Sequence, residues 1–318
     1  VVKTFVHISR LTYTQADEQA ETAELKPLFD IAERNIQRRK AAGAVFIQMP
    51  ETHLYVCLKE DQSEPPEIAI EEISKKRSSE MVREMMLLAG EGAARFAFKH
   101  GIPFPFISQE APDLPDVIPE GLAGQYRLRS SMRSRCIGVV PSDHAGLGLG
   151  MYSQVTSPLR RYSDLAAHQQ LRAYLDGTKM LDKNTLLEHI SAGDASAGAS
   201  IKAERKSRLH WTLCYLKQHP NWSGDGVVVE IKDKEAVVVI PELGMETKIS
   251  SSGNKLNDML KLAVASLDIP KLSVMFKVIL QEELTTEHTE DTESVTRQDQ
   301  AKISIGYIPQ ESSGVRSI

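Results

Sequence analysis

The first two thirds of the chain place apolar residues at the spacing of one face of an α-helix. Met81, Met85 and Leu88, for example, are three or four positions apart, so they fall on one side of a helix. Each such stretch ends at a glycine or at a His-Pro pair, which are common helix terminators. The pattern predicts helices over 15–41, 74–99, 157–176 and 196–218.

Two short β-prone runs follow the first predicted helix. Ala44–Ile47 and Leu54–Leu58 are separated by a segment that contains Pro50, and we expect them to pair as strands. Residues 103–119 are interrupted repeatedly by proline and predict a connecting loop. The acidic stretches near residues 61–72 and 282–300 are interpreted as solvated surface or tail.

The periodicity changes at Trp222. Short β-branched runs separated by turn signals predict strands over 226–231, 236–240, 246–249, 260–267 and 274–280. Five strands over about sixty residues are typical of an OB barrel. The polar segment after residue 282 predicts a mobile tail with one late strand at 303–308.

Composition excludes several classes of protein. The chain has 318 residues, of which 41% are hydrophobic and 25% charged, and no apolar run approaches the ~20 residues of a membrane span. We therefore expect no membrane role and a cytoplasmic location, with an organelle matrix as the alternative. Cys57, Cys136 and Cys214 are widely spaced, which predicts buried free thiols and no disulfide framework or zinc site.

Positive charge is concentrated, although the formal net charge is −5. Each concentration alone is equally consistent with a solvated basic face. Their combination favours a channel for a polyanion. The clusters are Arg34, Arg38, Arg39 and Lys40; Arg127, Arg129, Arg133 and Arg135; and Lys202, Arg205, Lys206 and Arg208.

The segment Thr156–Asp164 has the pattern of an anion-binding helix start. Ser157 suits an N-cap and the proline after it suits the first helical position, so Arg160 and Arg161 fall in the first turn. Free backbone N–H groups and the helix dipole favour a phosphate there. The alternative is an ordinary capped helix with a solvated ladder of Arg160, Asp164, His168 and Arg172.

This segment resembles the signature of the exoribonuclease II (RNB) family, in which Thr-Ser-Pro-Ile/Leu-Arg-Arg/Lys-Tyr-x-Asp follows a Gly-Leu-Gly run. The equivalent run here lies within His144–Gly150. Further similar segments occur in the family's order at Arg38–Phe46, Val82–Ala89 and Leu171–Leu175. The resemblance covers about residues 25–220.

The resemblance implies an α+β fold. Residues 1–221 would form a mostly helical C-terminal portion of an RNB-type ribonuclease domain, and 222–282 a five-stranded OB-fold RNA-binding barrel. Residues 283–318 would be a polar, acidic tail with the late strand.

The resemblance also implies that Arg160 is catalytic and braces the scissile phosphate. Arg161 would support the same phosphate or pair with an acid. Phe46 would stack on a base, or else pack in the core; Glu204 would lie near the RNA 3′ end, or else pair with Arg208. The implied RNA- or phosphate-binding residues are Ser157, Arg161, Phe46, Glu204, Glu84 and His144.

Members of this family bind Mg²⁺ with an upstream Asp-rich cluster, and no such run occurs in this sequence. The chain also begins at Val1, without Met. We therefore expect the C-terminal piece of a longer protein, with the magnesium ligands upstream, no metal ligand here, and no activity of this chain alone.

Two functional hypotheses follow. The first is a 3′-to-5′ hydrolytic exoribonuclease that degrades single-stranded RNA to 5′-nucleotides. The second is a non-catalytic RNA-binding module or degenerate homologue. Two departures from the family pattern bear on the choice: Ile107–Pro112 replaces Arg-x-His-x-x-Pro, and Gly90 stands where relatives often have Asn.

Overall fold

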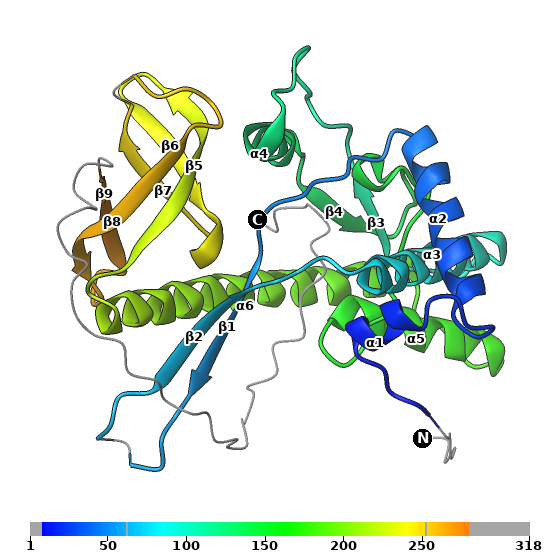
Figure 1. Ribbon diagram of the computed structural model, residues 1–318. Helices are drawn as coiled ribbons and strands as arrows, with labels where there is room; N and C mark the ends of the chain where they lie inside the picture. The colour runs from blue at the N-terminus through cyan, green and yellow to red at the C-terminus, as the bar shows by residue number, and fades with distance from the viewer. Residues whose placement is uncertain (1–7, 62, 252, 280–318) are drawn as a thin grey trace.

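The computed structural model describes residues 8–61, 63–251 and 253–279. A helical part and a β-barrel lie at opposite ends of one long helix, α6 (Lys183–Gln218), which runs across the molecule (Figure 1). A β-hairpin projects from the same helix. The observed class, helices followed by a nearly closed five-stranded antiparallel barrel, confirms the predicted α+β fold.

The predicted helix over 15–41 is two helices. α1 (Tyr13–Glu18) begins at a capping box in which Thr12 and Gln15 bond each other's backbone N–H. α2 (Lys26–Ala41) has a proline in its first turn, where its missing N–H would have had no helical partner. The second predicted helix is better placed, since α3 (Arg77–Lys99) closely matches 74–99.

The predicted strand pair is wrong in one partner. β1 (Thr52–Cys57) pairs antiparallel with β2 (Glu67–Glu72), in a segment interpreted from sequence as solvated surface. Residues 44–47 have no regular structure. Their backbone instead bonds to the glycine-rich loop, because the N–H of Val45 donates to the carbonyl of Gly146 at 3.0 Å.

The expected connecting loop contains one strand, β3 (Phe106–Gln109), which pairs with β4 (Arg135–Gly138). Between them lies α4 (Gly121–Ser131), an unpredicted helix. Cys136 on β4 is exposed, contrary to the prediction of a buried thiol, and Cys57 and Cys214 are half-buried.

Both later helices begin elsewhere than predicted. α5 (Tyr162–Leu175) starts after the Ser-Pro pair rather than at it. α6 starts well before residue 196 because Asp182 caps it, accepting the N–H groups of Asn184 at 2.9 Å and Thr185 at 3.0 Å. The small-residue stretch 191–200 inside α6 has no apolar periodicity that would have predicted a helix.

All five predicted barrel strands are present within a few residues of their expected bounds. Their order in the sheet is β7-β6-β5-β8-β9, with every pair antiparallel, and β7 also contacts β9. The whole predicted tail, 283–318, with its strand at 303–308, lies outside the described residues. The strands are β5 (Ser223–Lys232), β6 (Glu235–Ile240), β7 (Met245–Ser250), β8 (Met259–Asp268) and β9 (Ser273–Val278).

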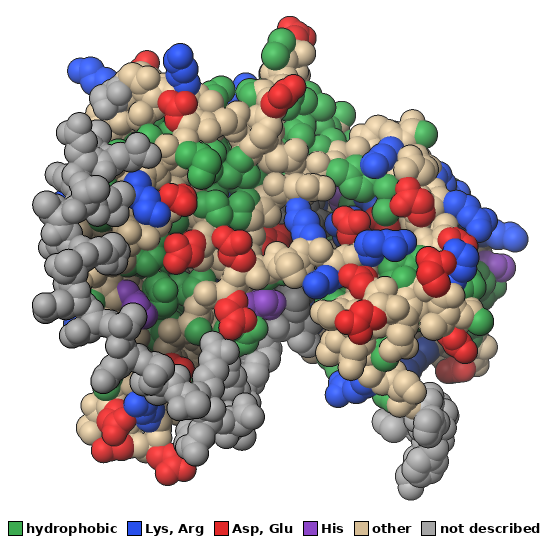
Figure 2. All heavy atoms as spheres, viewed as in Figure 1, with side chains coloured by type: hydrophobic (Ala, Val, Ile, Leu, Met, Phe, Trp, Pro, Cys, Tyr) green, Lys and Arg blue, Asp and Glu red, His purple; other side chains and the backbone are tan. Residues whose placement is uncertain are grey.

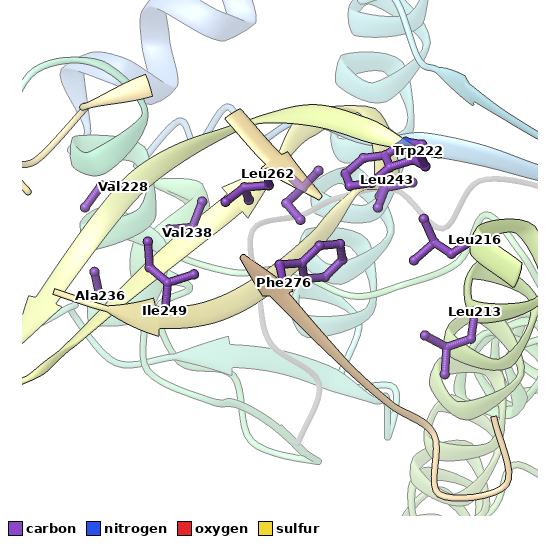
Figure 3. Close-up of a cluster of buried hydrophobic side chains, with 11 residues drawn as sticks. Leu213, Leu216, Trp222, Val228, Ala236, Val238, Leu243, Ile249, Leu262 and Phe276 are labelled. Carbon is purple, nitrogen blue, oxygen red and sulfur yellow. The ribbon is translucent and has the colours of Figure 1, made fainter. Parts of the chain in front are cut away.

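The barrel core continues into α6. Leu213 and Leu216 of the helix are fully buried and belong to the same apolar cluster as Trp222, Leu262 and Phe276 (Figure 3). Hydrophobic burial of this kind is the main stabilising contribution to a fold. The last turns of α6 are therefore part of the barrel's core.

We predict that Leu213→Ala lowers the free energy of unfolding by about 3 kcal/mol, since it removes a fully buried side chain and leaves a cavity. Urea denaturation followed by circular dichroism measures this change. Leu187→Ala is the control, because Leu187 is an exposed leucine of the same helix. Equal effects of the two substitutions would contradict a shared core.

Candidate nucleic-acid interface

A cavity of about 1780 Å³ lies where the helical part meets the hairpin and α6. Its wall combines segments far apart in sequence: the loop after α2, the loop before α5, the start of α5 and the middle of α6. The structure thus brings six of the seven residues predicted for the site to one wall: Phe46, His144, Ser157, Arg160, Arg161 and Glu204.

The loop before α5 does not form the predicted helical phosphate seat. The carbonyl of Ser157 accepts the N–H groups of Arg160 at 3.2 Å and Arg161 at 3.0 Å, which closes a turn over residues 157–161. We call this segment the 157–161 turn. The helix begins only at Tyr162, so Ser157 is not an N-cap and both arginines precede the helix.

The two arginines of the turn differ in their surroundings. Arg160 is exposed, lines the cavity and makes no side-chain hydrogen bond or ion pair with any described residue. Arg161 is half-buried and donates from Nε and Nη2 to Oδ2 of Asp164, at 3.1 and 2.8 Å. Arg160 therefore offers a free guanidinium to the cavity.

The predicted solvated ladder along α5 is absent. Asp164 is fully buried, and Nε2 of His168 lies 2.7 Å from the carbonyl oxygen of Val155. His168 thus makes a structural hydrogen bond to the loop before α5. Tyr162 is 43% exposed.

Tyr162 is held against α6. Its hydroxyl lies 3.2 Å from Nδ1 of His189, and a Cβ at Gly193 would come within 2.7 Å of its ring. A glycine is therefore required at this point of α6 for the close approach of the aromatic ring.

Phe46 lies under two cations of α2. The guanidinium of Arg39 and the ammonium of Lys40 are 5.1 and 5.4 Å from the ring centroid, within the range of cation–π attraction. The ring also lines the cavity. Because residues 44–47 form no strand, the alternative of core packing on a strand is wrong.

Glu84, which the resemblance predicts to bind RNA or phosphate, lies away from the cavity. It is fully buried on α3 and is not part of the cavity wall. Its carboxylate accepts from Arg39 Nη1 at 2.5 Å and Asn35 Nδ2 at 2.8 Å. Burial of a charge requires such partners, so Glu84 joins α3 to α2.

Arg39 extends this link to the glycine-rich loop. Its Nε donates to the carbonyl of Leu147 at 2.8 Å. Gly148 has φ +64°, and a Cβ there would lie 2.7 Å from the carbonyl oxygen of Arg39. The loop 144–150 therefore packs directly on the end of α2.

His144 lies on the cavity wall but is only 3% exposed. Burial lowers the pKa of His144 to about 4, so its imidazole is neutral at physiological pH. Its Nδ1 has no hydrogen-bond partner among the described residues. A neutral imidazole provides no charge to attract phosphate, which leaves hydrogen bonding as the role open to it.

Gly90, a departure from the family pattern, has a steric cause. A Cβ at this position would lie 2.4 Å from the carbonyl oxygen of Ser153 and 2.4 Å from the ring of Tyr152. Asn at this position would displace Tyr152, which lines the cavity. Glycine in place of the family's asparagine therefore leaves room for Tyr152 in the cavity wall.

Glu204 lines the cavity on α6 and is exposed. The alternative pairing with Arg208 is not formed, because Nη2 of Arg208 donates to the carbonyl of Thr52 at 2.8 Å. This contact ties the hairpin to α6.

Much of the predicted basic surface is used within the fold. Arg129 pairs with Glu246 of the barrel, Arg38 pairs with Glu91, and Arg135 pairs with Asp194 at 2.7 Å. The face in Figure 2 shows basic and acidic side chains interspersed. The guanidinium groups of these three arginines are therefore engaged within the fold.

The described part of the chain contains no group of three or more His, Cys, Asp or Glu placed to hold a metal ion. None of its helices is both long and apolar enough to cross a membrane.

Comparison with known proteins identifies the class. The RNB domain model matches residues 4–118 and 122–177. The model of the RNase II-type exonuclease C-terminal S1 domain matches residues 222–279. The fold is thus that of a ribonuclease domain followed by an S1 barrel.

The chain belongs to the RNB ribonuclease family. It is 35% identical over 295 residues to an uncharacterized ribonuclease of Synechocystis, and 30% identical over 297 residues to the chloroplastic/mitochondrial ribonuclease II of Arabidopsis thaliana. These alignments cover 86% and 85% of this chain. The chain spans 42% and 35% of the lengths of these relatives.

The fold is also similar to that of Mycoplasma genitalium RNase R, solved in complex with ribose-methylated single-stranded RNA. The TM-score is 0.65 at 16% identity, and the match covers 84% of this chain and 53% of that protein. At this identity the similarity concerns the fold alone.

We predict that Glu84→Gln lowers the free energy of unfolding by about 3 kcal/mol, because it leaves the buried Arg39 without its counterion. Chemical denaturation measures the loss. Glu80→Gln, at a partly exposed site on the same helix, should change stability by less than about 1 kcal/mol. Similar losses for both variants would show that the Glu84 pair is not structural.

The lowered pKa of His144 predicts that the free energy of unfolding depends on pH. Its folded-state pKa is lowered, so the unfolded chain binds the extra proton first as pH falls, and stability is lost from about pH 6.5 towards pH 4. Between pH 7 and pH 5 this group should cost the wild type about 2 kcal/mol. His144→Asn should remove that portion of the pH dependence, measured by urea unfolding at both values. The exposed His189→Asn should not, and a parallel pH profile for all three proteins would refute the assignment.

Proposed function

We propose that the complete protein is a 3′-to-5′ hydrolytic exoribonuclease acting on single-stranded RNA, and that this chain supplies its RNA- and phosphate-binding part. Family membership supports the reaction class. The observation that carries the assignment of the site is the free guanidinium of Arg160 in the same cavity as the ring of Phe46.

These two groups suit a single strand. A guanidinium can bind two oxygens of one phosphate, and an aromatic ring on the cavity wall can stack on an unpaired base, a contact worth ~1–3 kcal/mol. A base within a duplex already stacks on its neighbours, so Phe46 would favour a splayed strand. The mixed charge around the cavity favours a few local contacts over general attraction to polyanions.

Arg160 would act on the phosphate that is cleaved. Negative charge develops on the phosphoryl oxygens during hydrolysis, and a preorganised donor beside them stabilises the transition state more than the ground state. The product would be a 5′-nucleotide. Glu204, exposed on the same wall, would lie near the RNA 3′ end.

The proposed enzyme uses Mg²⁺, held by aspartates in the part of the protein that precedes this chain. When bound, the metal would activate water and neutralise phosphate charge. The contribution argued for the residues of this chain is RNA binding and phosphate positioning.

We predict that Arg160→Ala in the complete protein lowers turnover on a labelled single-stranded RNA by a factor of at least about 100, because a transition-state contact is lost. Single-turnover cleavage measures it. Arg172→Ala is the matched control, since Arg172 lies on α5 away from the cavity wall. Unchanged cleavage by the Arg160 variant would remove the role assigned to it.

The same experiment decides between the two hypotheses. If the complete wild-type protein binds the RNA but does not cleave it with Mg²⁺ present, the chain is part of a non-catalytic RNA-binding module. Digestion of RNA by this chain alone would instead show that the catalytic groups lie within it.

A further inference from the structure

The 157–161 turn is held by a single buried carboxylate. Asp164, in the first turn of α5, is fully buried. Its Oδ2 accepts three hydrogen bonds: from the backbone N–H of Ser157 at 2.8 Å, and from Nε and Nη2 of Arg161 at 3.1 and 2.8 Å. Nη2 of Arg161 also lies 3.2 Å from Oγ1 of Thr156.

These bonds join both ends of the turn to α5. Ser157 opens the turn and Arg161 closes it, and both donate to the same carboxylate oxygen. Between them, Leu159 is fully exposed and Arg160 is exposed, so neither packs on the protein to define the conformation. The geometry that presents Arg160 is therefore set by the backbone hydrogen bonds within the turn and by the bonds from both of its ends to Asp164.

We propose that Asp164 is a positioning residue for phosphate binding, and that Arg161 is its counterion rather than a phosphate ligand. This inference rests on the proposed function of the cavity. The charge of Arg161 is neutralised within the fold, and Arg160 is the unpaired cation of a turn that the structure describes in full.

A fixed turn has a physical advantage for binding. An arginine on a mobile loop would have to order both its backbone and its side chain when it meets a phosphate, and that ordering opposes binding. A turn already held by Asp164 leaves only the side chain of Arg160 to be ordered. Loss of Asp164 should therefore weaken binding through Arg160, although Asp164 itself never touches RNA.

Coupling between the two residues tests this directly. The variants are Arg160→Ala, Asp164→Asn and the double variant of this chain, and the readout is the dissociation constant of a fluorescently labelled single-stranded oligoribonucleotide at several salt concentrations. We expect each single variant to weaken binding about tenfold. The double variant should also be weakened about tenfold, because residues that act through one contact are not additive.

The salt dependence provides a second readout that a general loss of stability would not produce. Each phosphate contact contributes about 0.7 to the slope of log affinity against log salt for a single strand. Arg160→Ala and Asp164→Asn should each lower the slope by about this amount, and their combination by no more. Asp176→Asn, at the exposed C-terminal end of α5, should leave affinity and slope unchanged.

Arg161→Gln provides the decisive comparison if Asp164→Asn fails to fold, as judged by circular dichroism. Acting through the turn, Arg161→Gln should add nothing to the effect of Arg160→Ala. If Arg161 were a phosphate ligand, the Arg160/Arg161 double variant would lose about twice the slope of the single variant.

The outcomes separate this inference from the proposed function. Multiplicative losses for Arg160→Ala combined with Asp164→Asn or Arg161→Gln would overturn the positioning role and leave the phosphate contact intact. An Arg160→Ala variant that binds RNA as well as the wild type would overturn this inference, whereas the proposed function fails only if that variant of the complete protein cleaves RNA at the wild-type rate.

Discussion

The buried pair of Arg39 and Glu84 is the interaction on which the cavity wall depends. Glu84 lies on α3 and Arg39 on α2, and neither side chain is exposed to more than a few per cent. Each charge would be costly inside the protein without the other. Because the pair must form, the two helices have one register relative to each other.

Arg39 also connects the two helices to the cavity wall. Arg39 bonds the carbonyl of Leu147 and lies over the ring of Phe46, so one guanidinium contacts the glycine-rich loop and the aromatic wall. The backbone bond from Val45 to Gly146 connects these two segments again. The resemblance assigned Glu84 to substrate binding. In the structure Glu84 supports the cavity wall indirectly, because it binds Arg39, which in turn contacts the glycine-rich loop and Phe46.

Local pattern predicted the barrel well and the loop around Arg160 poorly, for different physical reasons. In the barrel, buried and exposed residues alternate along each strand and turn residues mark the strand ends, so both signals indicate the same bounds. At Ser157 the local sequence favours an N-cap, but the backbone N–H of Ser157 is taken by Asp164, seven positions away, and the helix starts later. The strand β2 was missed because its acidic residues obscure its short alternation.

Long-range partners explain the remaining differences. Arg39 and Glu84 are 45 positions apart, and Arg208 bonds Thr52 across 156; no spacing rule connects such residues. The cavity residues Phe46, Arg160 and Glu204 were nonetheless identifiable, because the resemblance to RNB proteins carries information that periodicity lacks. Only the structure shows that Arg161 is paired with Asp164 and that Arg160 has a free guanidinium.

The shared core of α6 and the barrel has a mechanical consequence. The helix that contributes Leu213 and Leu216 to the barrel also forms, a few turns earlier, the wall that carries Glu204. The S1 barrel therefore cannot swing independently as a hinged flap without exposing apolar surface. The spacing between the barrel and the cavity wall is therefore fixed by α6, and an RNA strand bound to both would have to span that fixed distance.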